Sequence, residues 1–111
     1  MKKKEDALRR RQKRKKKKFK TEPWFLYILR CSDGSFYTGI TKDLTKRLKQ
    51  HNGGKASRYT RTRRPVEMLY RESLTSRTEA LIRECAVKAL PKIKKVALVA
   101  ANPFNLKDQQ A

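Results

Sequence analysis

The pattern of apolar positions divides the chain near residue 23. Residues 1–22 contain no apolar stretch, whereas short apolar runs alternate with turn residues from there on. The aromatic and β-branched run WFLYILRC at 24–31 predicts a buried strand. The dipeptide Asp33-Gly34 separates it from a second apolar run at 35–40, and its glycine supplies the positive φ of a hairpin turn. The two strands should therefore pair antiparallel.

Helical spacing begins after this hairpin. On a helix that turns about 100° per residue, Leu44 and Leu48 form one apolar stripe. We expect this helix to begin near Asp43, with Thr41 as its N-cap and the Asp43 carboxylate at the positive end of the helix dipole. The run Asn52-Gly53-Gly54 should end it.

The rest of the chain predicts one more strand and two more helices. Segment 55–64 has the composition of a loop, and VEMLYRE at 66–72 predicts a third strand. A helix at 76–90 opens with a Ser-x-x-Glu capping box. Pro91 should break this helix, and KIKKVALVAA at 92–101 predicts a shorter last one. The expected fold class is α/β of the α+β type, with a small three-stranded antiparallel sheet flanked by helices.

Composition adds a strongly basic arm to this small domain. The chain has 111 residues, with 31 Lys and Arg against 10 Asp and Glu and a formal net charge of +21. Residues 1–22 hold 13 basic and 3 acidic side chains. We expect a disordered polybasic arm at 1–22, the folded domain at 23–101 and a C-terminal tail at 102–111.

The net charge indicates a polyanionic partner, such as a nucleic acid. Lysine clusters also bind anionic membrane surfaces, so charge alone leaves that alternative open for the arm. The arm lacks the apolar stretch of a signal peptide or membrane anchor, and the longest apolar run, WFLYIL, is too short to cross a bilayer. We therefore expect neither membrane insertion nor a small-molecule cofactor.

Cysteine usage indicates a reducing compartment. Cys31 and Cys85 are the only cysteines, and they lack a secretory signal or CxxC spacing, so they predict neither a disulfide nor a zinc site. We expect a cytoplasmic protein in which both thiols behave as small, buried or half-buried apolar side chains.

Two side chains do not fit a helix that only packs. Arg47 and His51 are four residues apart and border the leucine stripe, so they should point toward the sheet rather than toward water. Tyr37, followed by a predicted glycine turn at Gly39, lies on the strand that these two side chains would face. The three polar side chains should therefore meet.

The order of these residues resembles the GIY-YIG nuclease domain. The resemblance covers about residues 24–100 and is closest to the small stand-alone bacterial members. The positions that carry it are Tyr27, Tyr37-Thr38-Gly39, Arg47, His51 and Glu84. Successive gaps of ten, ten and four residues lead from Tyr27 to His51. FLY at 25–27 replaces the family's Gly-Ile-Tyr and YTG replaces its Tyr-Ile-Gly, and the small members commonly share both changes.

The resemblance implies a metal-dependent endonuclease or nickase that hydrolyses DNA phosphodiester bonds. It implies catalytic roles for Tyr27, Tyr37, Arg47 and His51, and one Mg²⁺ or Mn²⁺ ion held by Glu84. A tyrosine, whose ordinary pKa is about 10, can act as a base only beside cations or a proton acceptor, which Arg47 and His51 could supply. The planar fork of Arg47 also matches two phosphate oxygens.

Each of these residues has an ordinary structural explanation as well. The two tyrosines could form a cross-strand pair that only packs, and Glu84 could pair with Lys88 at i, i+4. Arg47 could be a solvated helix charge, and His51 could interact with the C-terminal end of the helix dipole. The ordered spacing favours one shared site over separate coincidences, and it leaves open which tyrosine is the base.

Segment 55–64 supplies the candidate nucleic-acid contacts. We expect its cations to bind phosphates and its tyrosine to be free to stack on a base, while a solvated loop is the alternative. The residues are Lys55, Arg58, Tyr59, Arg61, Arg63 and Arg64. The competing function is a non-catalytic DNA- or RNA-binding module on the same scaffold, including an RNA- or ribosome-associated factor. The sequence leaves the nucleic-acid specificity and the oligomeric state open.

Overall fold

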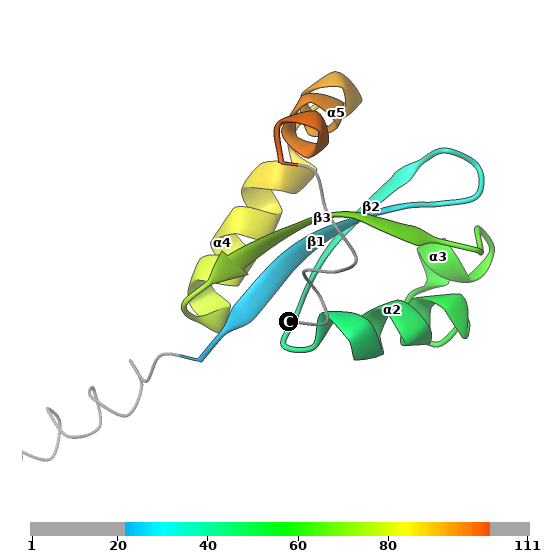
Figure 1. The fold of residues 1–111 in the computed structure, drawn as a ribbon, viewed down its shortest axis with the longest axis horizontal. Coiled ribbons are helices and arrows are strands. Elements are labelled where there is room, and N and C mark those ends of the chain that lie inside the picture. The colour runs from blue at the N-terminus through cyan, green and yellow to red at the C-terminus, as the bar shows by residue number, and fades with distance from the viewer. Residues whose placement is uncertain (1–21, 103–111) are drawn as a thin grey trace, which may run out of the picture.

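The structure is a computed structural model that describes residues 22–102. These residues form a three-stranded antiparallel sheet with helices on both faces (Figure 1). The strand order is β2-β1-β3, so the first strand lies in the middle. The predicted α+β fold class is confirmed. The strands are β1 (Trp24–Arg30), β2 (Phe36–Thr41) and β3 (Glu67–Leu74), and the helices are α2 (Leu44–Asn52), α3 (Arg58–Arg61), α4 (Arg77–Lys88) and α5 (Lys92–Ala101).

The predicted arm and tail lie outside the described residues, except for Glu22 and Asn102. The polybasic arm at 1–22 and the C-terminal tail at 102–111 therefore stay predictions, as does the cytoplasmic location. Between residues 22 and 102, every helix is too short or too polar to cross a membrane.

The sheet separates two cores, because side chains alternate between its faces along each strand. On β1, Tyr27 and Leu29 face one side while Leu26 and Ile28 face the other, and none of the four is more than 1% exposed. The core on the side of α2 and α3 consists of Tyr27, Leu29, Cys31, Leu44, Val66 and Met68. The core on the side of α4 and α5 consists of Leu26, Ile28, Tyr70 and Val87.

A β-bulge lets β3 contribute to both cores. Ile28 pairs with Tyr70 and Leu29 pairs with Met68, so β3 has one residue more than β1 at this point. Met68 and Tyr70 consequently lie in different cores although they are only two residues apart.

The first helix begins at a different cap from the predicted one. The Asp43 side chain accepts a hydrogen bond from the backbone N–H of Lys46 at 3.0 Å, which makes Asp43 the N-cap. The Thr41 hydroxyl instead accepts from the backbone N–H of Asp43 at 3.1 Å. The prediction of Thr41 as the N-cap is wrong, because Thr41 is still part of β2, where it pairs with Phe25.

A short helix lies inside the segment that was predicted to be a loop. Helix α3 begins at Ser57, whose side chain accepts a hydrogen bond from the backbone N–H of Thr60 at 3.1 Å. The loop prediction for 55–64 is therefore wrong at Arg58–Arg61. The reason is local, since Ser57 caps this turn of helix, and tertiary, since Thr60 is completely buried.

The end of α2 is tied to the start of β3. The Asn52 side chain accepts from the backbone N–H of Val66 at 2.8 Å and donates to the Val66 carbonyl at 3.2 Å. This two-point contact fixes the last turn of α2, and with it the position of His51, against the sheet.

Helix α4 begins as predicted. The Ser76 side chain accepts from the backbone N–H of Glu79 at 3.1 Å, and the Glu79 carboxylate accepts from the backbone N–H of Thr75 at 3.0 Å. Pro91 separates α4 from α5, which confirms the predicted break.

The two cysteines differ in burial, and both are free thiols. Cys31 is buried in the core beside α2, as expected. The prediction is wrong for Cys85, which is exposed. Helix α4 turns Ala80 and Val87 toward the sheet, and Cys85 lies on its opposite side.

Candidate active site

Tyr27 and His51 form a buried hydrogen-bonded pair on the side of the sheet that carries α2. Tyr27 comes from the central strand and His51 from the last turn of α2. The Tyr27 Oη and His51 Nε2 atoms are 2.8 Å apart, and both residues are about 1% exposed. Buried polar side chains are costly unless they are paired, so this contact fixes both groups.

Gly39 makes room for this pair. It lies within β2, directly opposite Tyr27 in the sheet, and not in a turn, so the predicted glycine turn is wrong. A Cβ atom at this position would lie 2.5 Å from Tyr27 Oη and 2.6 Å from Tyr27 Cζ. Glycine is needed here because the phenol lies over the strand backbone.

Tyr37 completes an aromatic cluster around the imidazole. Its ring centroid lies 5.1 Å from that of His51, in an edge-to-face arrangement, and 6.5 Å from that of Tyr27. Tyr37 is only half-buried, so it forms the border between the buried pair and solvent. The ring of Tyr59 stacks beside Tyr37 at 6.1 Å.

Arg47 supplies the positive charge at this cluster. It is half-buried and lines an open pocket of about 250 Å³ next to Trp24 and Lys46. Its charge acts against ionisation of His51 and in favour of ionisation of Tyr27. The structure thus brings Tyr27, Tyr37 and His51 together, and Arg47 lies close enough for its charge to act on Tyr27 and His51.

Both members of the buried pair are neutral at physiological pH. Burial raises the pKa of Tyr27 well above its ordinary value, the neighbouring Tyr37 phenol and the Glu84 carboxylate raise it further, and Arg47 opposes the change. Burial, assisted by Arg47, lowers the pKa of His51 to about 4. A neutral imidazole therefore faces a neutral phenol, so one nitrogen of the ring is available to accept a proton.

Glu84 lies on α4, the helix that packs on the opposite face of the sheet from α2 (Figure 1). One turn after buried Ala80 and three residues before buried Val87, it lies on the face of α4 that packs against the sheet. Its carboxylate is half-buried and lies 3.6 Å from Lys88 Nζ, and its charge raises the pKa of Tyr27. Glu84 therefore belongs to the electrostatic environment of Tyr27.

The donor set around Glu84 fits only a weakly held cation. Residues 22–102 contain no group of three or more His, Cys, Asp or Glu side chains that could hold a metal ion. A single half-buried carboxylate suits Mg²⁺, which usually keeps several waters and shares its remaining ligands with substrate phosphates. The ion pair with Lys88, longer than a hydrogen bond, leaves the carboxylate oxygens available.

Arg63 and Tyr59 are engaged with the protein itself. Arg63 donates to the Asp33 carboxylate and to the Tyr59 carbonyl, both at 2.9 Å, and its guanidinium lies 3.9 Å from the centroid of the Tyr59 ring. One face of Tyr59 is thus covered by Arg63, and the ring also stacks with Tyr37. The structure does not leave Tyr59 free to stack on a base as predicted, and its role in binding stays a prediction.

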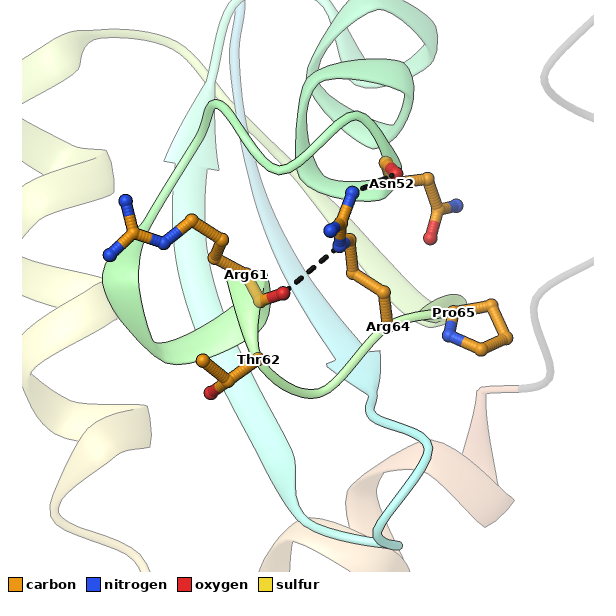
Figure 2. Close-up of a pocket in the computed structure, with 5 residues that line it drawn as sticks. All are labelled: Asn52, Arg61, Thr62, Arg64 and Pro65. Atoms are coloured by element: carbon orange, nitrogen blue, oxygen red, sulfur yellow. Dashed lines mark hydrogen bonds between the residues drawn. The ribbon is translucent and has the colours of Figure 1, made fainter.

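The other predicted binding residues are exposed cations. They are Lys55, Arg58, Arg61 and Arg64. Arg64 donates to the carbonyls of Arg61 at 2.9 Å and of Asn52 at 3.2 Å. Figure 2 shows its guanidinium beside the end of α2, while the side chain of Arg61 points away from it. Both residues line an open pocket of about 390 Å³. Phosphate binding by these cations stays a prediction.

Sequence reasoning did not single out Thr60. Its Oγ1 atom lies 2.8 Å from His51 Nδ1 and 2.9 Å from Ser57 Oγ, on the side of the sheet that carries α2 and α3. The one local signal is the Ser-x-x-Thr pattern at 57–60, which is typical of an N-cap and says nothing about a histidine nine residues earlier.

Comparison with known proteins identifies the family. Residues 23–95 match the GIY-YIG catalytic domain. The UPF0213 protein DP2720 of Desulfotalea psychrophila is 49% identical over 80 residues, or 71% of this chain and 73% of that protein. The UPF0213 protein XAC3202 of Xanthomonas axonopodis pv. citri is 43% identical over 89 residues, or 80% of this chain and 87% of that protein.

A solved structure is similar as well. The solution NMR structure of the UPF0213 protein BH0048 from Bacillus halodurans has a TM-score of 0.48 and 42% sequence identity, covering 71% of this chain and 84% of that one. The family match spans more than half of the chain and includes all five positions that carried the resemblance. The chain therefore belongs to the GIY-YIG family, a nuclease-type superfamily, and its relatives include the small bacterial UPF0213 proteins.

Proposed function

We propose that this chain is a metal-dependent endonuclease or nickase that hydrolyses phosphodiester bonds in DNA. The observation that carries the proposal is the 2.8 Å hydrogen bond between Tyr27 and His51, two buried neutral groups with Arg47 and Glu84 close enough to shift their pKa values. This combination, a proton donor and acceptor beside a cation and a carboxylate, is what phosphodiester hydrolysis needs.

Tyr27 is assigned as the base because it has a proton acceptor in direct contact. In the proposed step, a water oxygen attacks phosphorus in line with the departing 3′ oxygen. The water proton passes to Tyr27 Oη while the phenolic proton passes to His51 Nε2, and the bond between phosphorus and the 3′ oxygen breaks. The water would reach Tyr27 from the side of half-buried Tyr37, where the cluster meets solvent.

Arg47 is assigned to the charge that develops on the phosphate oxygens. Its planar fork donates two hydrogen bonds to two oxygens at once, which a lysine cannot do. Because Arg47 is half-buried, its interaction with the transition state is stronger than that of a fully solvated charge.

Glu84 is assigned to one Mg²⁺ or Mn²⁺ ion, with water and substrate phosphate as the remaining ligands. When bound, the ion would neutralise phosphate charge and stabilise the departing oxygen. With a single protein carboxylate, affinity for the metal should be weak without DNA.

The competing function is a binding module for DNA or RNA on the same scaffold. Exposed cations such as Lys55, Arg58 and Arg61 would serve it equally well. Binding does not need a buried Tyr27–His51 pair, however, and two buried polar side chains cost stability compared with apolar ones. We therefore favour the enzyme.

The decisive experiment incubates supercoiled plasmid with the full chain, with and without Mg²⁺ or Mn²⁺. The parent should nick the plasmid only with metal, and Glu84→Gln should abolish nicking because the amide keeps the shape but lacks the charge. Glu67→Gln is the matched control, since it removes one exposed carboxylate on β3 and should nick like the parent.

Metal-dependent nicking by Glu84→Gln at the parental rate would show that the ion is held elsewhere. Absence of nicking by the parent with either metal, together with tight DNA or RNA binding, would favour the binding module. A preference for structured RNA over duplex DNA would identify the RNA-associated alternative.

A further inference from the structure

We propose that Thr60, held in place by Ser57, is a positioning residue that keeps the proton of His51 on Nδ1 and so leaves Nε2 as the acceptor for Tyr27. This inference rests on the proposed function for its catalytic meaning, although the tautomer itself can be tested without any cleavage.

The contacts form a continuous series of hydrogen bonds on the side of the sheet that carries α2 and α3. His51 Nδ1 lies 2.8 Å from Thr60 Oγ1, and Thr60 Oγ1 lies 2.9 Å from Ser57 Oγ. Ser57 Oγ accepts from the backbone N–H of Thr60 at 3.1 Å, and the Ser57 carbonyl is 3.5 Å from the Thr60 hydroxyl. Thr60 is completely buried and His51 is 1% exposed, so the hydrogen bond between them is shielded from solvent.

The Tyr27 phenol favours one tautomer of the His51 ring, and Thr60 supplies the acceptor that this tautomer needs at Nδ1. Tyr27 is neutral and buried, and His51 Nε2 is the only hydrogen-bond partner of its hydroxyl among residues 22–102. If Nε2 carried the ring proton, the phenolic proton would be left buried without an acceptor, which is costly. The phenol therefore donates to Nε2, and the neutral ring must carry its proton on Nδ1.

Thr60 can accept a hydrogen bond from the Nδ1–H group of His51. A hydroxyl has one proton and two lone pairs, so Thr60 Oγ1 can accept from His51 Nδ1 and from the Ser57 hydroxyl while its own proton points toward the Ser57 carbonyl. Every polar hydrogen in the series of contacts from Tyr27 to Ser57 then has an acceptor. In the opposite arrangement the Tyr27 proton has none among the described residues.

A neutral partner for the imidazole has a chemical consequence. The groups facing His51 are Tyr27 from β1, Tyr37 from β2, Arg47 from its own helix and Thr60 from α3. Among residues 22–102 no carboxylate is hydrogen-bonded to the ring. A carboxylate there would stabilise the imidazolium, whereas Thr60 orients the ring without stabilising its charged form. The proton taken from Tyr27 is thus held only briefly and is available for the departing oxygen.

The test uses the fact that His51 is the only histidine of the chain. A ¹⁵N–¹H long-range correlation spectrum of the full chain at neutral pH reports the tautomer of this one ring, and the Nδ1–H form should dominate. Thr60→Val keeps the shape of the side chain and removes the hydroxyl. It should shift the population toward Nε2–H and lower the nicking rate by about 10- to 100-fold, the range for losing a group that orients a functional histidine.

Two further variants separate positioning from folding. Thr60→Ser restores a hydroxyl and should recover both the Nδ1–H tautomer and most of the nicking rate, whereas a purely structural role would leave the tautomer unchanged in all variants. Thr45→Val removes an exposed hydroxyl from α2 and should change neither readout.

A dominant Nε2–H tautomer in the parent would overturn the inference, with or without nuclease activity. An unchanged tautomer and an unchanged nicking rate in a folded Thr60→Val variant would also overturn it. If the parent does not nick but shows the Nδ1–H tautomer that Thr60→Val loses, the positioning role holds and the proposed function fails.

Discussion

Two tyrosines on opposite faces of the sheet, Tyr27 and Tyr70, are both buried and hydrogen-bonded, but their partners differ in charge. Burial is the main cause of a raised pKa for both Tyr27 and Tyr70, and the pKa of Tyr70 rises to about 12. Tyr27 is hydrogen-bonded to a neutral imidazole at 2.8 Å, whereas Tyr70 donates to the Glu72 carboxylate at 2.7 Å. The two phenols are similar, and their acceptors are not.

The site around Tyr70 is electrostatically closed. Arg83 Nε lies 2.8 and 3.1 Å from the two carboxylate oxygens of Glu72. The negative charge of the carboxylate that accepts the Tyr70 hydrogen bond is therefore balanced by the arginine. A carboxylate that is already paired with a guanidinium accepts this hydrogen bond and leaves the proton on the phenol. On the other face, His51 is a neutral imidazole, and among residues 22–102 no carboxylate is hydrogen-bonded to it, so its Nε2 contacts the Tyr27 hydroxyl without a charged partner. The polar pair on the α4 face is therefore a charge-balanced structural contact, whereas the pair on the α2 face is the one that we propose transfers a proton.

Removing the two hydroxyls tests this comparison most strongly. Tyr27→Phe should lower the rate of plasmid nicking by about 100- to 10,000-fold, the usual contribution of a general base, because the proton path to His51 is lost. Tyr70→Phe should leave nicking within a few-fold and reduce the free energy of unfolding by about 1 kcal/mol through one lost hydrogen bond. Nicking time courses and urea unfolding of both variants provide the measurement. Parental nicking by Tyr27→Phe would refute its assignment as the base.

The arginines on the two faces should differ in the same way. Arg47→Ala should lower nicking by about 100- to 1,000-fold, as expected when one transition-state donor is removed, with little loss of DNA affinity because many other cations remain. Arg83→Ala should keep nicking and cost about 1 kcal/mol of stability, a modest amount because the Arg83 side chain is 38% exposed.

A filter-binding titration alongside the nicking assay distinguishes these effects. Arg47→Lys is the informative control, since it preserves the charge and should recover only part of the rate. If Arg47→Ala weakened binding and nicking by the same factor, Arg47 would be a general phosphate contact rather than a group that acts in the transition state.

The pH dependence of stability should differ between the two faces of the sheet, because His51 titrates at acidic pH and Tyr70 at alkaline pH. His51 has a folded pKa of about 4 against an ordinary value of 6.5, so its neutral form stabilises the fold fully above pH 6.5 and this stabilisation is lost as the pH falls toward 4. Between pH 7 and pH 5 the free energy of unfolding should fall by about 2 kcal/mol. Tyr70, with a raised pKa, should lose its contribution only as the pH rises above 10.

Urea unfolding at pH 7, 6 and 5 measures the acidic effect. The pKa values of Asp33 and Glu79 are lowered by their hydrogen bonds, so these carboxylates lose their contributions at lower pH than His51 does. His51→Gln should therefore be less stable at pH 7 and should show a flat profile between pH 7 and 5. A slope that persists in this variant would mean that another group titrates in this window.

The fold and much of the site could be predicted because their signals are local. The β1 and β2 strands follow from aromatic and β-branched runs around Asp33-Gly34, where Gly34 has a φ of 82°. The position of His51 and Arg47 beside Leu44 follows from helical spacing alone. Local periodicity thus determined which side chains would face the sheet.

The features that were missed depend on contacts between distant parts of the chain. The role of Gly39 depends on its register opposite Tyr27, and a turn residue and a space-making residue look alike in sequence. Arg63 reads as a free phosphate ligand until Asp33, thirty residues earlier, is found beside it. Thr60 reads as a helix-capping partner until the fold brings it to His51. Sequence patterns give the residue types, whereas tertiary register decides their partners.

The smallest expected effect concerns Lys88, the ion-pair partner of Glu84 on α4. The ion pair spans 3.6 Å, and the Lys88 side chain is 55% exposed. Exposed pairs at i, i+4 contribute about 0.3 to 0.5 kcal/mol, so Lys88→Ala should reduce stability by no more than that and should leave nicking unchanged. Urea unfolding and a metal titration of the nicking rate are the two measurements.

The double variant decides what the carboxylate is for. If Glu84 serves as the metal-binding carboxylate, Glu84→Gln should abolish nicking equally in the parent and in Lys88→Ala, because the two functions of the carboxylate are independent. Lys88→Ala should also lower the Mg²⁺ concentration needed for half-maximal nicking slightly, since a competing cation has been removed from a carboxylate that needs one. If Lys88→Ala instead abolished nicking by itself, the lysine would be part of the proposed site. Helix α4 would then contribute two residues to that site, Glu84 and Lys88.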